Sequence, residues 1–117
     1  MKFRVEESNE RPIAFFDDEK PPRNWLLSFF LEEARTDVQD YLDEIESART
    51  GELEHTGYGG NSVDVRFYAD RAVIEELWPA GGEDAEPERI EIPLEQAQQL
   101  LLDWQVALEQ WRAKRTG

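Results

Sequence analysis

The sequence contains no cysteine and one histidine among its 117 residues, and acidic side chains outnumber basic ones by 27 to 13. Without cysteine there can be no disulfide, thiolate zinc site or iron–sulfur cluster, which fits a reducing compartment, and the cytoplasm is the expected location. A single histidine would need several carboxylates at ligand spacing to hold a metal, and no such spacing occurs. We therefore expect neither a metal nor a cofactor.

Basic clusters and long apolar runs are also lacking. A formal net charge of −14 argues against nucleic-acid binding, which needs clustered Lys and Arg to neutralise phosphates, and against docking on anionic membranes. No apolar run approaches the roughly 18 residues of a membrane span. The N-terminal residues 1–12 carry charges where a signal peptide would have its apolar region, so we expect no export.

Enough apolar residues remain for a folded core. Leu, Ile, Val and Phe make up 28 of the 117 residues, above the level of roughly 20% below which a highly charged chain stays disordered. A chain of this length is predicted to form one domain spanning residues 1–117.

Alternating and apolar segments predict several strands. Residues 2–7 alternate and 13–16 form a short apolar run, which together predict an opening hairpin. A second hairpin is predicted from 63–68 and 72–78, and a short strand from 90–92. The glycine-rich residues 57–61 are typical of a turn, with a further strand possible just before them.

Two segments have helical periodicity. Apolar residues step by three and four over Trp25–Arg49, with Gly51 as the stop, and again from Leu94 after Pro93. Segregated strands between two long amphipathic helices predict an α+β fold, with an antiparallel meander of about five or six strands packed against both helices.

Catalytic signatures are absent from the sequence. The only histidine, His55, has no nucleophile-elbow sequence with it, and we expect it to be an ordinary strand or loop residue. Residues 57–62 lack the third glycine and the lysine of phosphate loops, which favours a hairpin turn. Acidic pairs are too abundant for any one of them to indicate a glycosidase-like site. We assign no catalytic residue and expect a protein that is not an enzyme.

The excess negative charge lies in two segments. Residues 32–54 carry nine acidic and two basic side chains, and residues 75–95 carry eight and one. These can be a solvated helix face and a soluble loop, or a docking surface for a basic protein. The second interpretation gains support from the like charges at i,i+4 spacing in the first segment, because their repulsion costs helix stability.

The candidate partner-binding residues follow from this charge pattern. We expect the acidic residues at three-four spacing to share one face of the first helix, with the acidic loop of the second segment and two strand aromatics as further contacts. These candidates are Glu33, Asp37, Asp40, Glu44, Glu83, Asp84, Glu86, Tyr68 and Trp78.

The second half of the chain resembles a known class of proteins. A strand pair around DVRFYADRAVIEELW, followed by IEIPLEQAQQLLLDWQVALEQW in a small, acidic, cysteine-free α+β chain, resembles the immunity proteins of bacterial contact-dependent inhibition and related polymorphic toxin systems. The resemblance is architectural and implies an inhibitor that binds a cognate toxin domain. It assigns no individual residue.

Charge and resemblance together predict a binding protein that neutralises a basic toxin domain. If the toxin is a nuclease, its substrate cleft must be positive, and carboxylates can stand where phosphates would bind. Two alternatives remain open: an adaptor or chaperone for a basic protein, and a small acid/base hydrolase, which would need a pocket holding a carboxylate of raised pKa.

Overall fold

The computed structural model describes residues 1–51, 56–79, 81–82 and 84–116, and within these the side chains of residues 58 and 116 are not described. The predicted α+β class and the antiparallel pairing of the strands are confirmed. In chain order the elements are β1 (Arg4–Ser8), β2 (Arg11–Phe15), α1 (Arg23–Glu33), α2 (Val38–Thr50), β3 (Thr56–Gly59), β4 (Val63–Phe67), β5 (Arg71–Glu76), β6 (Arg89–Pro93) and α3 (Leu94–Thr116).

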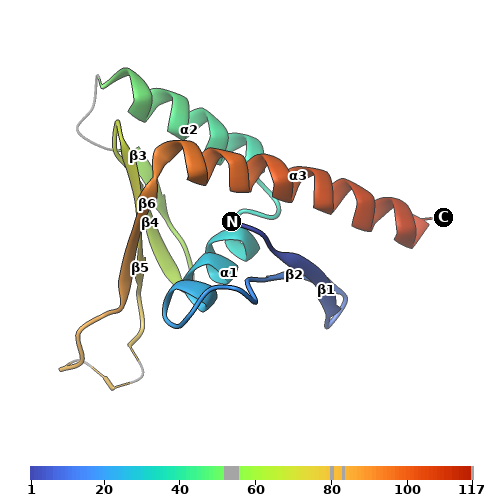
Figure 1. Ribbon diagram of the computed structural model, residues 1–117, viewed down its shortest axis with the longest axis horizontal. Helices are drawn as coiled ribbons and strands as arrows, with labels where there is room; N and C mark the ends of the chain where they lie inside the picture. The colour runs from blue at the N-terminus through green and yellow to red at the C-terminus, as the bar shows by residue number, and fades with distance from the viewer. Residues whose placement is uncertain (52–55, 80, 83, 117) are drawn as a thin grey trace.

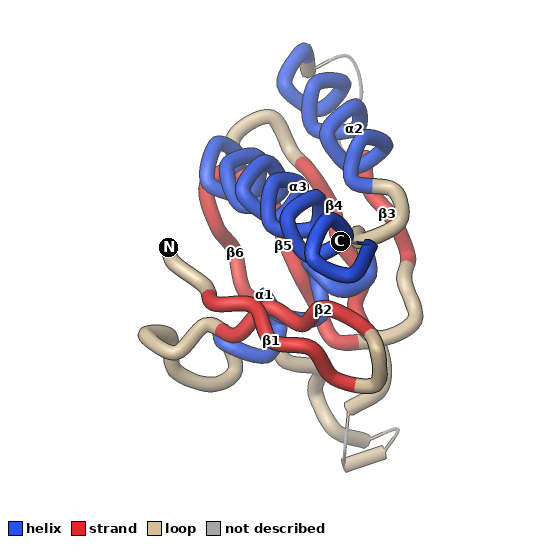
Figure 2. The backbone as a smooth tube through the Cα atoms, turned by 90° about the vertical axis from the view of Figure 1, so that its right-hand side faces the viewer, coloured by secondary structure: helices blue, strands red, loops and turns tan. Residues whose placement is uncertain are grey.

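The strands are divided between two sheets instead of forming one meander. β1 and β2 form the predicted opening hairpin, with Val5 opposite Ala14, and Figure 2 shows it apart from the other strands. Its turn places Asn9 and Glu10 at φ of 53° and 63°, a conformation that Asn tolerates better than most residues. Phe3, just before β1, joins the hairpin to the core because its ring lies 6.0 Å from that of Trp104.

The other four strands form an antiparallel meander in the order β3-β4-β5-β6. Alternation along β4 directs Val63, Val65 and Phe67 to one face, where all three are buried. Ile74, which pairs with Val65, and Ile92 of β6 are buried as well. In Figure 1 the sheet lies nearly edge-on, with α1 and α3 against the same side of it, so one face of the sheet contacts the core.

The single helix predicted over residues 25–49 is wrong, because the chain turns at residues 34–37 and begins a second helix. Asp37 occupies the N-cap position of α2, and its carbonyl accepts hydrogen bonds from the N–H groups of Asp40 and Tyr41 at 3.0 and 3.3 Å. An unbroken helix of that length would run about 37 Å. The turn instead lets α1 bury residues against β2 and the sheet while α2 buries its own against β3 and α3.

The predicted last helix is confirmed as α3. Its apolar positions Leu94, Ala97, Leu101, Trp104 and Leu108 are all buried. Trp111, which continues the same spacing, is only half-buried, since the C-terminal turns of α3 run beyond the sheet (Figure 1). Within the described residues, no helix is both long enough and apolar enough to span a bilayer.

The glycine-rich segment is only partly a turn. Residues 56–59 form the edge strand β3, and the turn is confined to residues 60–62. Gly57 lies so close to β4 that a Cβ would meet the carbonyl of Val65, so the side-chain-free residue is what permits this pairing. The further strand expected over 53–56 coincides with β3 at Thr56, whereas residues 53–55, with His55, lie outside the described residues.

Candidate functional site

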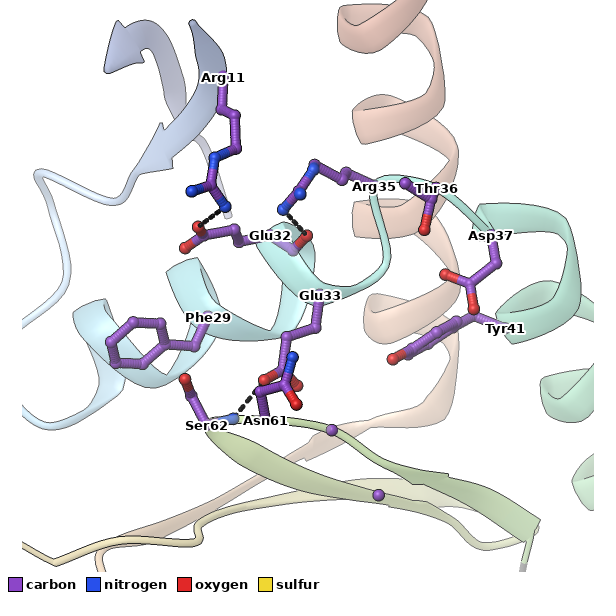
Figure 3. Close-up of a pocket in the computed structure, with 12 residues that line it drawn as sticks. Arg11, Phe29, Glu32, Glu33, Arg35, Thr36, Asp37, Tyr41, Asn61 and Ser62 are labelled. Atoms are coloured by element: carbon purple, nitrogen blue, oxygen red, sulfur yellow. Dashed lines mark hydrogen bonds and ion pairs between the residues drawn. The ribbon is translucent and has the colours of Figure 1, made fainter. Parts of the chain in front are cut away.

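A pocket of about 510 Å³ opens between the end of α1, the start of α2 and the turn joining β3 to β4 (Figure 3). Carboxylates of Glu32, Glu33 and Asp37 line it, together with the guanidinium groups of Arg11 and Arg35. The turn contributes Gly60, Asn61 and Ser62, and α1 contributes the partly exposed ring of Phe29. The pocket therefore combines charges of both signs with an aromatic wall.

Glu33 fastens the turn to α1. Its Oε1 atom accepts a hydrogen bond from the backbone N–H of Ser62, a contact visible in Figure 3. Its Oε2 atom is buried and has no hydrogen-bond partner among the described residues. A Cβ built on Gly60 would overlap this carboxylate, so only glycine lets the turn lie so close. Glu33 is thus a half-buried structural carboxylate and not part of the exposed face predicted for it.

Both arginines that line the pocket contact Glu32, near the end of α1. Arg11 Nη1 lies 4.0 Å from Glu32 Oε1, and Arg35 Nη1 donates to the Glu32 carbonyl at 3.4 Å. From α3, Arg112 Nη2 donates to the carbonyl of Arg35 at 3.3 Å. These contacts stabilise the junction between the helices, and none of the three arginines forms an ion pair with Asp37.

Three predicted candidates do share one side of α2. Asp37, Asp40 and Glu44 are spaced by three and four residues, and we call them the acidic flank. None of the three forms an ion pair with any residue that the structure describes, although nine other carboxylates are paired with arginines. Three of the unpaired carboxylates of the first acidic segment are therefore grouped here.

The acidic flank adjoins two hollows. Asp37 lines the pocket described above, and with Asp40 it also lines a second groove of about 330 Å³ between the start of α2 and the C-terminal half of α3. Glu109 and Arg112 form the α3 side of that groove. A partner that contacts the flank can thus place side chains on both sides of the helix junction.

Trp78 is bonded to the turn that lines the pocket. β5 ends at Glu76, so Trp78 lies two residues beyond the strand predicted to contain it. Its indole N–H donates to the carbonyl of Asn61 at 2.8 Å, while the N–H of Leu77 donates to that of Ser62 at 2.9 Å. Asn61 and Ser62 line the pocket, so the turn connects Trp78 to it. With 78% of its surface exposed, Trp78 is the most exposed large apolar residue that the structure describes.

The acidic loop continues from Trp78. Asp84 and Glu86 are exposed, and no described residue forms an ion pair with either. The structure does not place them against the pocket. Glu83 lies outside the described residues, so its predicted role has no structural account.

Tyr68 is not part of this site. It follows β4 at the end of the sheet where Phe67 pairs with Ala72, whereas Trp78 lies at the opposite end, beyond the pair of Val63 and Glu76. The guanidinium of Arg71 lies 4.2 Å from the centre of its ring. Hydrogen bonding with Tyr68, followed by the charge of Asp64, raises the pKa of Arg66. Tyr68 therefore already contacts this chain's own arginines.

Sequence reasoning missed Gly60, Asn61 and Ser62 as contributors to the site. The paired glycines did signal a turn, but its bond to Glu33 is a contact between residues 29 positions apart that no local pattern shows. Among the described residues, no group of three or more His, Asp or Glu side chains is arranged to hold a metal ion.

Searches among known proteins return nothing that resembles this chain: no protein family, no curated protein and no solved structure matches it.

Proposed function

We propose that this chain is a non-enzymatic binding protein that docks a basic protein through one continuous surface. That docking surface consists of the acidic flank (Asp37, Asp40 and Glu44), the pocket beside Glu33, and Trp78, which is bonded to the turn that lines the pocket. The observation that carries the proposal is the absence of any ion pair to the acidic flank among the described residues. Asp40 and Glu44 repel each other at i,i+4 on α2, and their grouping with the N-cap residue Asp37 beside a pocket favours a partner that neutralises them.

A basic toxin domain is the partner that we propose. Carboxylates at the docking surface would occupy a positively charged cleft, and in a nuclease they would replace substrate phosphates. Complementary charge raises the rate of association, by a factor of about 10 to 1,000 at low salt, and rapid capture is what an inhibitor of a toxin needs. The chain would then act as a cytoplasmic immunity protein.

The test begins with a tagged full-length chain used to capture partners at low salt, followed by mass-spectrometric identification. Binding of the purified partner is then measured by calorimetry and stopped-flow fluorescence at about 50 and 500 mM NaCl. We expect one tight basic partner, with the association rate falling steeply as salt rises. Several partners of similar affinity would indicate an adaptor or chaperone instead.

A charge-matched pair of variants locates the surface. The first carries Asp37→Asn, Asp40→Asn and Glu44→Gln, and the control carries Glu10→Gln, Asp18→Asn and Asp103→Asn, three exposed acidic residues elsewhere. Both lose the same net charge. We expect the first to slow association by about tenfold or more at low salt and the control to change it much less. An acidic partner, or equal effects of both variants, would refute the proposal.

A further inference from the structure

Trp78 is an aromatic residue that this chain leaves bare. Three other partly exposed aromatic rings each lie beneath an arginine of the same chain, at 4.7, 4.2 and 4.9 Å from guanidinium carbon to ring centre: Phe15 under Arg4, Tyr68 under Arg71, and Trp111 under Arg115. Trp78, with 78% of its surface exposed, has no ring or cation contact with any described residue. These three rings are thus covered by cations of the chain itself, whereas the most exposed ring, that of Trp78, is not.

The indole of Trp78 is fixed in place with only its ring surface available. Its single donor, the N–H, is already bonded to the Asn61 carbonyl at 2.8 Å, so no hydrogen-bond acceptor is needed from outside. The backbone beside it is anchored by the bond from Leu77 to Ser62, and the turn itself is held by Glu33. A fixed aromatic residue loses little conformational entropy on binding, which is why such residues contribute strongly to interfaces.

The sequence segment that contains Trp78 is acidic, which favours a cation as its ligand. Residues 72–88 contain six acidic side chains and no Lys, Arg or His. No arginine in this segment can therefore cover the ring as Arg71 covers Tyr68. The face of an indole attracts cations, most often arginine, because its quadrupole is negative there, and neighbouring carboxylates strengthen that attraction.

From these observations we infer that Trp78 is the anchor on which the basic partner stacks an arginine side chain. A guanidinium is planar and can lie flat on the indole while its N–H groups stay free to donate hydrogen bonds, whereas a lysine ammonium is a compact, strongly hydrated charge. The inference rests on the proposed function and adds to it the type of side chain that is recognised at one end of the docking surface.

The test uses the full-length chain and an octa-arginine peptide as the probe. Tryptophans are replaced by 5-fluorotryptophan, the four ¹⁹F resonances are assigned with single Trp→Phe variants, and peptide binding is measured at about 50 mM NaCl. We expect the Trp78 resonance to shift on titration, and Trp78→Ala to weaken binding about three- to tenfold. Octa-lysine should shift that resonance less. Trp111→Ala is the matched control, since Arg115 already covers that ring, and it should leave the affinity unchanged.

The outcomes separate this inference from the function on which it rests. If the acidic-flank variant weakens peptide binding but Trp78→Ala does not, the inference is wrong and the acidic docking surface stands. If the acidic-flank variant binds as tightly as the unmodified chain, the docking surface itself is refuted. A Trp78 resonance that does not move in saturating peptide would also overturn the inference.

Discussion

The Glu33 carboxylate accepts a hydrogen bond from the backbone N–H of Ser62, and this contact ties the end of α1 to the turn between β3 and β4. The same turn supplies the Asn61 carbonyl that holds the indole of Trp78. A carboxylate that the sequence placed on an acidic helix face thus organises the rim of the pocket. The contribution of this contact to stability can be measured with variants of Gly60 and Glu33.

Gly60 and Gly59 are neighbours, but replacing each with alanine should change the stability of the protein to different extents. In Gly60→Ala the new methyl group would overlap the Glu33 carboxylate, so that carboxylate must move and its bond to Ser62 is disturbed, and we expect a loss of about 1–3 kcal/mol in the free energy of unfolding. In Gly59→Ala the nearest atom is Asp64 Oδ1 at 3.8 Å, an ordinary contact. That change should alter stability by less than about 1 kcal/mol.

Urea denaturation followed by circular dichroism compares the two glycine variants. Adding Glu33→Ala removes the atoms with which the methyl group collides, so Gly60→Ala should cost less in that background. Equal losses for Gly59→Ala and Gly60→Ala would show that the carboxylate does not lie against the turn.

Glu33 itself should matter for stability more than a surface acid does. Glu33→Ala leaves the N–H of Ser62 without its acceptor, which we expect to cost about 1–3 kcal/mol, whereas Glu33→Gln keeps an acceptor oxygen and should cost less. Hydrogen exchange of the Ser62 amide, followed by NMR, is the direct measurement. If Glu33→Ala left that amide as protected as before, the bond would not be what orders the turn.

The elements with strong local signals were predicted well. The hairpins and α3 follow from alternation, from the apolar stripe, and from Pro93 just before the helix. Gly51, predicted as a helix stop, ends α2 with φ of 74°. In each case the residues that carry the signal lie within a few positions of one another, so local preference and tertiary packing agree.

The break between α1 and α2 could not be predicted from periodicity. The apolar spacing of three and four continues through Ala34 and Val38, although the chain turns between them and each half faces different neighbours. Thr36 and Asp37 favour helix ends, but packing decides which signal prevails. The break also explains why Glu33 leaves the predicted acidic face while Asp37, Asp40 and Glu44 keep it.

Repulsion between Asp40 and Glu44 should reduce the stability of the free protein. Asp40 and Glu44 lie at i,i+4 on α2, so Glu44→Gln should raise the free energy of unfolding by about 0.2–0.5 kcal/mol at low ionic strength. At 1 M NaCl the gain should vanish, because the screening length falls to about 3 Å. Glu46→Gln on the same helix is the control. Glu46 is paired with Arg49 at 2.7 Å, so its loss should bring no gain. A gain from Glu44→Gln that persisted in high salt would exclude charge repulsion as its cause.

Trp104 offers a final test, of the core on which the site is built. Its side chain is fully buried beside Phe3, and its indole N–H has no hydrogen-bond partner among the described residues. Trp104→Ala should cost about 3–5 kcal/mol in the free energy of unfolding, since it leaves a large cavity.

Trp104→Phe keeps an aromatic ring and removes a buried N–H that forms no hydrogen bond with a described residue. We therefore expect it to lower the free energy of unfolding by less than about half as much as Trp104→Ala does. Thermal and urea unfolding of both variants measure the difference. A phenylalanine variant as unstable as the alanine variant would mean that the indole N–H makes a favourable bond in solution. A buried water molecule would then be the natural acceptor, since such waters bond otherwise unsatisfied polar groups.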